Sequence, residues 1–207
     1  MSDLPADAEK SRSAKVALRN RLLTARRRLS PPELRAAAEK LHLQTRDLVR
    51  RTAPSTIAAY VPVGPEPGGA DLLTLLAAEA RVILPVLLPD GDLDWAVYEG
   101  VLVAGPRGLQ EPPGPRLGVE AVRSAGLVLV PALAVDARGR RMGRGGGSYD
   151  RALSRLDPPP PASPLIVALL HDGEFVDEVP AEPHDRPVHG VITPTGGFLN
   201  RTAEWTK

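Results

Sequence analysis

The chain has 207 residues, of which 43% are hydrophobic and 25% are charged, with a net charge of +1 and no cysteine. This length fits one domain over residues 1–207, and the absence of cysteine excludes disulfides, thiolate metal sites and thiol catalysis. No apolar run approaches the ~20 residues of a membrane span, and the acidic start of the chain is unlike a signal peptide. We therefore expect a cytoplasmic protein with no membrane segment.

The first 51 residues are predicted to form two helices. Apolar residues recur at helical spacing from Val16 to Leu29, and Ser-Pro-Pro-Glu at 30–33 is typical of the cap of a second helix, which ends near Arg51. We expect residues 1–10 to form a disordered tail. Across residues 1–51, Lys and Arg exceed Asp and Glu. We interpret this positive charge as the solvated face of a helix rather than as a contact with phosphate or nucleic acid. Because only 3% of the chain is aromatic, no surface that stacks bases is expected, and nucleic acid is not a predicted partner.

Beyond Ala53, the sequence predicts strands that alternate with helices. Short apolar runs bounded by glycine and proline predict five strands: Thr56–Val61, Val82–Leu87, Leu127–Val130, Leu165–Leu170 and Val188–Thr193. Helices are expected over Ala70–Ala80 and Tyr149–Leu156. This alternation predicts an α/β fold with three layers, in which helices cover both faces of a mostly parallel sheet.

Four further segments have distinct patterns. Polar and apolar residues alternate over Asp92–Tyr98, which predicts a strand that pairs antiparallel at a sheet edge. Gly105–Gly118 is rich in glycine and proline and is expected to loop over the surface. Gly64–Gly69 and Asp157–Pro164 are expected to be stiff connectors, and the second is a proline-rich loop.

The strongest functional signal is a loop rich in glycine and arginine that follows the strand Leu127–Val130. In an open α/β sheet, ligands collect at the carboxyl ends of strands, which is where this loop lies. Its glycines let backbone N–H groups turn toward an anion, and the guanidinium groups of Arg141 and Arg144 can bind phosphate oxygens in pairs. The helix expected from Tyr149 adds a partial positive charge. The loop suits a polyphosphate, and a surface loop without a ligand remains the alternative.

Two common phosphate motifs are absent from this loop. A dinucleotide fingerprint needs Gly or Ala at the position of Ser148, and no Gly-Lys-Ser/Thr Walker sequence occurs in the chain. Asp150 has two interpretations: an acid that stabilises the first turn of its helix, or a metal ligand that needs a second carboxylate.

The remaining candidates favour structural roles. His184 and His189 lie on no predicted helix, so surface positions are favoured over a metal site. His42 and His171 are expected to be structural. Trp95 is expected to pack on an edge strand rather than to line a ligand pocket.

The Gly/Arg loop resembles the hallmark motif of the 5-formyltetrahydrofolate cyclo-ligases, also called methenyltetrahydrofolate synthetases. In this chain the motif is Asp136-x-x-Gly139-x-Arg141-Met142-Gly143-Arg144-Gly145-Gly146-Gly147-Ser148-Tyr149-Asp150-Arg151. The resemblance extends to Lys15-Val-Ala-Leu-Arg19, Tyr60-Val-Pro-x-x-x-Glu66, Gly108-Leu-Gln-Glu111-Pro112 and the closing segment from Val176 to Thr193. Three positions depart from the family pattern: Ser148 replaces a tyrosine, Ala132 a glycine and Val135 a phenylalanine.

The resemblance implies an enzyme that uses ATP and Mg²⁺ to convert 5-formyltetrahydrofolate to 5,10-methenyltetrahydrofolate, on a fold like that of ribose-phosphate isomerase and CoA transferase. It implies ATP contacts from Lys15, Val16, Ala17, Leu18, Arg19, Arg141, Met142, Gly143, Arg144, Gly145, Gly146, Gly147, Ser148 and Tyr149. It implies folate contacts from Arg19, Val61, Glu66, Arg144, Gly145, Gly146, Gly147 and Ser148, and Mg²⁺ ligation by Asp150 and Asp185. Catalysis is expected to depend on Lys15, Arg141 and Arg144.

The implied reaction needs ATP because a formamide oxygen is a poor leaving group. We expect that oxygen to take the γ-phosphoryl group, N10 of the folate to close the ring, and ADP and phosphate to be released, with no protein nucleophile. Two alternatives remain: a non-catalytic nucleotide- or folate-binding protein on the same fold, and a phosphosugar isomerase or acyltransferase. We expect a monomer, and a dimer remains open.

Overall fold

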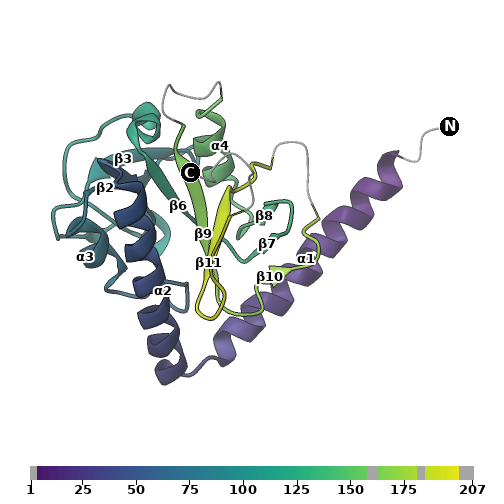
Figure 1. Ribbon diagram of the computed structural model, residues 1–207. Coiled ribbons are helices and arrows are strands. Elements are labelled where there is room, and N and C mark those ends of the chain that lie inside the picture. Colours follow the sequence, from purple (N-terminus) through teal and green to yellow (C-terminus); the bar gives the residue numbers. More distant parts are fainter. Residues whose placement is uncertain (1–3, 158–162, 181–184, 201–207) are drawn as a thin grey trace.

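A seven-stranded sheet forms the centre of the computed structural model, which describes residues 4–157, 163–180 and 185–200 (Figure 1). In spatial order its strands are β12 (Gly197–Asn200), β11 (Gly190–Thr193), β9 (Leu165–Leu169), β6 (Leu127–Pro131), β1 (Thr56–Ala58), β2 (Arg81–Leu87) and β3 (Leu93–Val97). The inner strands are all parallel, and β3 and β12 pair antiparallel at the two edges. The predicted mostly parallel sheet and its antiparallel edge strand over 92–98 are therefore confirmed.

Helices cover both faces of this sheet. The face that includes Ile57 and Leu127 packs against α2 (Pro31–Thr52) and α3 (Leu72–Ala77). The opposite face, which includes Ala58 and Val128, packs against the shorter α4 (Ser148–Ser154) and the 3₁₀ helix η2 (Val119–Ser124). Successive residues of each strand thus enter opposite cores, because side chains alternate along a strand. Trp95 is fully buried in the second core, as its expected packing role requires.

Helix α2 begins at the cap that the sequence predicts. The backbone N–H of Glu33 donates to Ser30 Oγ at 3.5 Å, and the backbone N–H of Ser30 donates to Glu33 Oε2 at 2.8 Å. This reciprocal arrangement satisfies two backbone donors at the start of the helix.

Helix α1 (Leu4–Arg28) packs beside a small second sheet rather than on the main one (Figure 1). The small sheet consists of β10 (Phe175–Val176), β7 (Ala134–Asp136) and β8 (Arg141–Met142). Leu22 of the helix packs there with Leu133 and Met142. We expected residues 4–10 to belong to a disordered tail, but they are part of the helix. The Ala, Glu and Lys residues of that segment favour a helix. Residues 1–3 lie outside the described part.

A short hairpin replaces part of the irregular loop expected over 105–118. Strand β4 (Val103–Ala104) pairs antiparallel with β5 (Gln110–Glu111) around the 3₁₀ turn η1 (Pro106–Gly108). Within the turn, Arg107 and Gly108 adopt positive φ values of 57° and 74°. Residues 64–69 contain no helix or strand, as expected, and most of the proline-rich connector 157–164 lies outside the described residues.

Candidate active site

A cavity of about 790 Å³ lies beyond the carboxyl ends of β1 and β6. The chain leaves β1 to form β2 on one side and later returns to form β6 on the other, so the strand order reverses between them. Ligands in open α/β sheets bind at such a switch point. Tyr60 and Val61 follow β1, Ala132 and Leu133 follow β6, and all four line the cavity.

The Gly/Arg loop reaches this cavity by way of the hairpin between β7 and β8. Asp136 is fully buried and accepts three backbone N–H groups, including those of Arg140 and Val179. Gly139 has a φ of 75°, and a Cβ there would lie 2.3 Å from the carbonyl oxygen of Val188, so the turn requires glycine. The first Asp and Gly of the motif therefore shape the hairpin, and neither lines the cavity.

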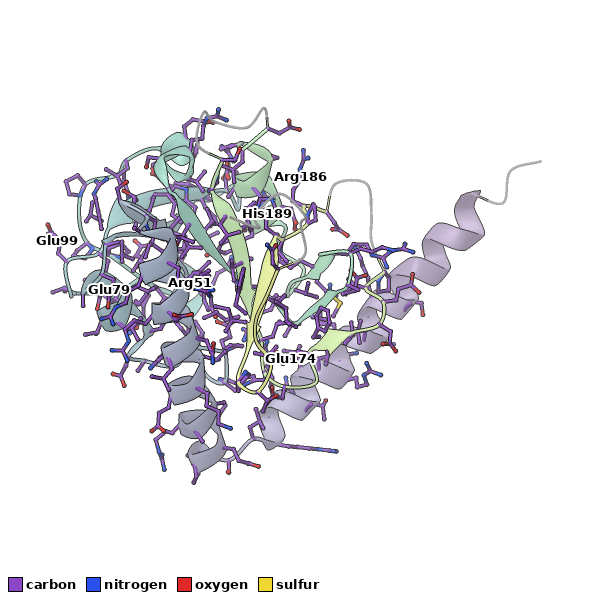
Figure 2. The ribbon with its side chains drawn as sticks, in the orientation of Figure 1. Arg51, Glu79, Glu99, Glu174, Arg186 and His189 are labelled. Atoms are coloured by element: carbon purple, nitrogen blue, oxygen red, sulfur yellow. The ribbon has the colours of Figure 1, made fainter. Side chains whose placement is uncertain are left out.

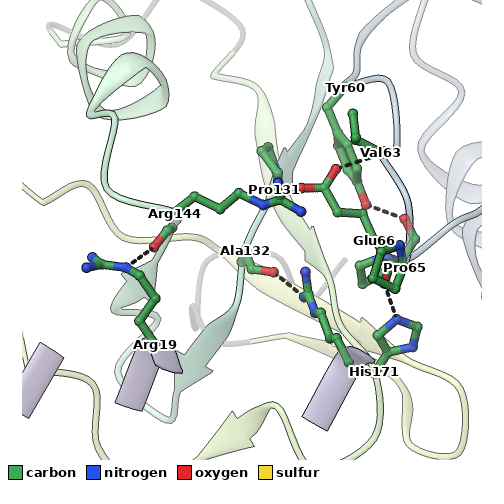
Figure 3. Close-up of polar contacts among 12 residues, drawn as sticks. Arg19, Tyr60, Val63, Pro65, Glu66, Pro131, Ala132, Arg144 and His171 are labelled. Carbon is green, nitrogen blue, oxygen red and sulfur yellow. Dashed lines mark hydrogen bonds and ion pairs between the residues drawn. The ribbon is translucent and has the colours of Figure 1, made fainter. Parts of the chain in front are cut away.

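Contacts at both ends fix the glycine segment 143–147. Arg19 Nε donates to the carbonyl oxygen of Gly143 at 3.3 Å, which joins α1 to the loop (Figure 3). Gly145 has a φ of 103°, and a Cβ there would lie 3.4 Å from the Arg19 guanidinium. At the other end, Ser148 Oγ donates to the carbonyl oxygen of Gly91 at 2.6 Å. The backbone of the segment is thereby held against the cavity that it lines.

Two cations of the cavity pair with the two carboxylates that the sequence assigned to Mg²⁺. Lys15 Nζ lies 2.8 Å from Asp185 Oδ2, and Arg141 Nη2 lies 2.6 Å from Asp150 Oδ1. Arg141 also donates through Nη1 to the carbonyl oxygen of Pro131 at 3.2 Å. The structure thus brings the predicted phosphate-binding and metal-binding residues together in one place.

A third ion pair crosses the cavity between its two sides. Arg144 Nε lies 3.0 Å from Glu66 Oε1, and Figure 3 shows these side chains reaching toward each other. The backbone N–H of Val63 donates to the other oxygen, Glu66 Oε2, at 2.9 Å. The Glu66 side chain is 10% exposed, whereas that of Arg144 is 51% exposed. The arginine can therefore turn away more readily than the glutamate.

Two buried polar atoms at the cavity lack a hydrogen-bond partner in the described part of the chain. They are Arg141 Nε and the Tyr149 hydroxyl. Burial, reinforced by the negative charge of Glu66, raises the pKa of the Tyr149 hydroxyl, and the nearby Arg141 offsets only part of this rise. The hydroxyl therefore stays protonated and can donate. Because a buried unsatisfied donor costs about 1–3 kcal/mol, a ligand that accepts from either group would be favoured.

Most of the predicted site residues line the cavity, and two do not. Lys15, Val16 and Arg19 face it from α1, but Ala17 and Leu18 are absent from its lining. The helix explains the difference, because residues at positions i and i+4 share a face and those between them turn away. The other lining residues that the sequence predicted are Val61, Glu66, Arg141, Met142, Gly143, Arg144, Gly145, Gly146, Gly147, Ser148, Tyr149, Asp150 and Asp185.

Sequence reasoning missed several cavity residues, and the charged ones among them fall into two groups. The β4–β5 hairpin contributes Arg107, Leu109, Gln110 and Glu111, which we expected to lie in a surface loop. The quoted Gly-Leu-Gln-Glu-Pro turn was the available signal for this group. Arg26, at the last turn of α1, also lines the cavity, and no motif in the sequence identified it.

The described histidines make structural contacts. Among the described residues, no group of three or more His, Asp or Glu side chains gathers as a metal site. His189 accepts the backbone N–H of Ile166 through Nδ1 at 3.1 Å, which is a structural contact, and His184 lies outside the described residues. His42 and His171 each contact a backbone carbonyl oxygen, as their expected structural roles require. None of the described helices is long and apolar enough to cross a membrane.

Comparisons with known proteins identify the family of this chain. The model of the 5-formyltetrahydrofolate cyclo-ligase family matches residues 11–194. A 5-formyltetrahydrofolate cyclo-ligase from Mycolicibacterium smegmatis is 43% identical over 193 residues, which cover 90% of this chain and 96% of that protein. The chain belongs to the 5-formyltetrahydrofolate cyclo-ligase family. All of the predicted site residues lie within the matched region of this family.

Solved structures of the same kind of protein share the fold. The NMR structure of 5,10-methenyltetrahydrofolate synthetase from Aquifex aeolicus has a TM-score of 0.74 at 27% identity, covering 90% of this chain and 92% of that chain. A 5,10-methenyltetrahydrofolate synthetase from Mycoplasma pneumoniae has a TM-score of 0.68 at 20% identity, covering 91% and 99%, which establishes the likeness of fold alone.

Proposed function

We propose that this member of the cyclo-ligase family converts 5-formyltetrahydrofolate to 5,10-methenyltetrahydrofolate at the expense of ATP, with Mg²⁺. One observation carries the proposal: the cations Lys15, Arg141 and Arg144, the glycine segment 143–147 and Glu66 line a single cavity at the switch point of the sheet. The cavity volume of about 790 Å³ lies within the range of small-molecule sites.

The triphosphate of ATP would replace carboxylates as the partner of the three cations. Lys15, Arg141 and Arg144 already contact anionic oxygens at 2.6–3.0 Å, so their present positions suit anion binding. The buried Nε of Arg141 offers one further N–H for a phosphate oxygen. The glycine backbone, Ser148 and Tyr149 would complete the nucleotide site. We assign the contacts of α1 to Lys15, Val16 and Arg19, because Ala17 and Leu18 do not line the cavity.

Asp150 and Asp185 would hold Mg²⁺. Both carboxylates line the cavity, and in the proposed exchange Arg141 and Lys15 would move from them onto phosphate. One or two carboxylates, completed by water and phosphate oxygens, is the donor set that Mg²⁺ prefers. When bound, the ion would neutralise charge on the transferring phosphoryl group.

Glu66 would hold the folate. The pterin ring presents N–H donors along one edge, and an ionised carboxylate accepts them. Val61, Arg19 and the 144–148 segment would surround the rest of this substrate, and the Tyr149 hydroxyl would supply a donor. Because Glu66 Oε2 is already held by the Val63 N–H, only its contact with Arg144 must change.

The reaction requires the protein to position charged groups, and it needs no covalent intermediate with the protein. The formyl oxygen attacks the γ-phosphorus, and the bond to ADP breaks. N10 then attacks the formyl carbon and loses its proton, and the carbon–oxygen bond breaks as phosphate leaves. Lys15, Arg141 and Arg144 would stabilise the charge on the phosphoryl oxygens throughout.

We extend the proposal to the remaining features of the molecule. The main sheet would be of the ribose-phosphate isomerase and CoA transferase type. The chain would act as one cytoplasmic domain and as a monomer, with folate and nucleotide as its ligands and without nucleic acid.

A direct assay tests the function. The purified protein is incubated with 5-formyltetrahydrofolate, ATP and Mg²⁺, and the near-ultraviolet absorbance of the methenyl product is followed, with reactions lacking ATP or Mg²⁺ as controls. Product that depends on both supports the proposal. Binding of nucleotide without product would instead favour a non-catalytic binding protein.

A further inference from the structure

A buried ion pair joins α1 to the loop after β9. Arg26 Nε lies 2.6 Å from Glu174 Oε1, and Arg26 Nη2 lies 2.8 Å from Glu174 Oε2. The two side chains are 2% and 5% exposed. Figure 2 shows Glu174 next to α1, although Glu174 and Arg26 are far apart in the sequence. Arg26, one partner of this bidentate pair, forms part of the wall of the cavity.

The pair continues into a network with two arms. In one arm, Arg26 Nη2 donates to the carbonyl oxygen of Ala132, at the end of β6, at 2.6 Å. In the other, Glu174 Oε2 accepts the backbone N–H of His171 at 2.8 Å, and the His171 ring contacts the carbonyl oxygen of Pro65 at 2.9 Å (Figure 3). Because a carbonyl oxygen only accepts, His171 Nε2 carries the proton in this contact.

The network is connected to the proposed site in two ways. Lys15, Arg19 and Arg26 recur at intervals of four and seven residues, so they share one face of α1. Fixing Arg26 therefore fixes the rotation of the helix that carries the two cations. The second arm holds Pro65, the neighbour of Glu66 in the chain.

Stability alone is a poor explanation for this pair. Charged pairs this deeply buried are costly to desolvate, and well-packed apolar side chains often serve stability equally well. What an apolar contact cannot supply is a fixed direction, which two parallel N–H···O contacts provide.

We propose that Arg26, Glu174 and His171 are positioning residues, which set the nucleotide and folate ends of the site separately. This inference rests on the proposed function. The Arg26–Glu174 pair orients Lys15, which we assign to the nucleotide alone, together with Arg19, and His171 holds the backbone beside Glu66 for the folate. None of the three acts on the reacting atoms.

The folate arm is tested with His171→Phe, which keeps a ring of similar size but removes the donor to Pro65. Dissociation constants are measured by calorimetry for 5-formyltetrahydrofolate and, separately, for a non-hydrolysable ATP analogue with Mg²⁺. The constant for the folate should rise about fivefold, and that for the nucleotide should stay within about twofold. His171→Gln retains a side-chain N–H donor and should recover most of the lost folate affinity.

The nucleotide arm is tested with the double variant Arg26→Met/Glu174→Gln. The double change avoids leaving one charge buried alone, and the amide oxygen introduced by Glu174→Gln can still accept the backbone N–H of His171. The constant for the nucleotide analogue should rise about tenfold or more, with a smaller effect on folate. The matched control is Arg50→Met/Glu79→Gln, which changes an exposed pair of the same kind away from the cavity and should leave both constants unchanged.

The outcomes separate positioning from simple support of the fold. Selective loss of one ligand in each variant, at a thermal midpoint close to that of the parent, supports the proposal. Equal losses for both ligands, or unchanged constants, overturn it. Ring closure by the unmodified protein is measured in parallel, so a failure of the proposed function is seen independently of these binding constants.

Discussion

Arg141 is held by two contacts and keeps one buried N–H for a ligand. Its Nη1 and Nη2 donate to Pro131 and Asp150, while its Nε has no partner in the described part of the chain. A lysine cannot reproduce this fork, because its charge sits at a single point. The guanidinium is therefore both a structural clamp on the end of β6 and a proposed phosphate ligand.

Replacing this fork tests the role of Arg141. We expect Arg141→Lys to lower kcat about 100-fold in the ring-closure assay, because a charge is kept but its direction is lost. Arg138→Lys is the matched control, since Arg138 is exposed on the same hairpin and lies outside the cavity. Parental turnover in Arg141→Lys would show that Arg141 is not one of the catalytic residues.

The metal assignment depends on Asp150. We expect Asp150→Asn to lower turnover by about 100-fold or more and to weaken the dependence of rate on Mg²⁺, with a lower thermal midpoint because the buried Arg141 loses its ion-pair partner. Asp177→Asn, at an exposed position, is the control. Parental rates in the Asp150 variant would show that this carboxylate does not hold the metal.

At the level of elements, the β7–β8 hairpin places the Gly/Arg loop, and Asp136 stabilises its turn. Burial by itself raises the pKa of the Asp136 carboxyl, but hydrogen bonds from the Val179 backbone and from Arg140 outweigh burial and lower it below the ordinary value. Arg140 Nε lies 2.6 Å from Asp136 Oδ2. Because the pKa is lowered in the folded state, the carboxylate contributes stability above its unfolded pKa, and this contribution is lost as the pH falls through the folded pKa.

Asp136→Asn should therefore destabilise the fold in a pH-dependent way. At pH 7 we expect a loss of roughly 2–3 kcal/mol in the free energy of unfolding, because the amide nitrogen would face the N–H groups of Arg140 and Val179. The difference in the free energy of unfolding between the unmodified protein and the variant should shrink as the pH falls below 3.8, the ordinary pKa of this carboxyl, and through its lower folded pKa. Denaturant unfolding at several pH values measures this difference. A difference that is constant with pH would contradict the stabilising role of the ionised Asp136 carboxylate.

The elements that the sequence predicted are those with a local signal. The strands of the parallel sheet are apolar runs, and the cap of α2 is a four-residue pattern, so both could be identified. The two-residue strand β8 and the hairpin partners β4 and β5 are too short to show a period. Pairing between β10 and β7 joins distant segments, and nothing in either sequence indicates the other.

The same distinction applies to the site. A dense motif identified the Gly/Arg loop, and the family resemblance identified Lys15 and Glu66. Their ion-pair partners, Asp185 and Arg144, lie far away in the chain, so only the fold brings these pairs together. Arg26 could not be identified, because one arginine within a basic helix carries no distinguishing pattern.

At the scale of the whole molecule, three cations of the cavity are each paired with a carboxylate of the cavity. Three cation–carboxylate pairs line it, and they come from α1, the segment after β1, the Gly/Arg loop and the segment before β11. A triphosphate with Mg²⁺ brings both an anion for the cations and a cation for the carboxylates. Under the proposed function, nucleotide binding would exchange the partners of these three pairs.

This exchange should make the nucleotide and the metal stabilise the fold together. At a concentration about 100 times its dissociation constant, a non-hydrolysable ATP analogue with Mg²⁺ should add about 2.7 kcal/mol and raise the thermal midpoint by roughly 5–10 °C. The rise should be smaller with a chelator present, and smaller in the double variant Lys15→Gln/Arg144→Gln. An equal rise in the thermal midpoint for the unmodified protein with Mg²⁺, for the same protein with a chelator and for the double variant would place the nucleotide outside this cavity.

A crystal structure with Mg²⁺ and a non-hydrolysable ATP analogue tests the central claim most directly. We predict that the triphosphate lies along residues 143–147, with Lys15, Arg141 and Arg144 turned from their carboxylates onto its oxygens. The metal should lie between the phosphates and the carboxylates of Asp150 and Asp185. A nucleotide bound elsewhere, with the three ion pairs intact, would contradict the proposed site.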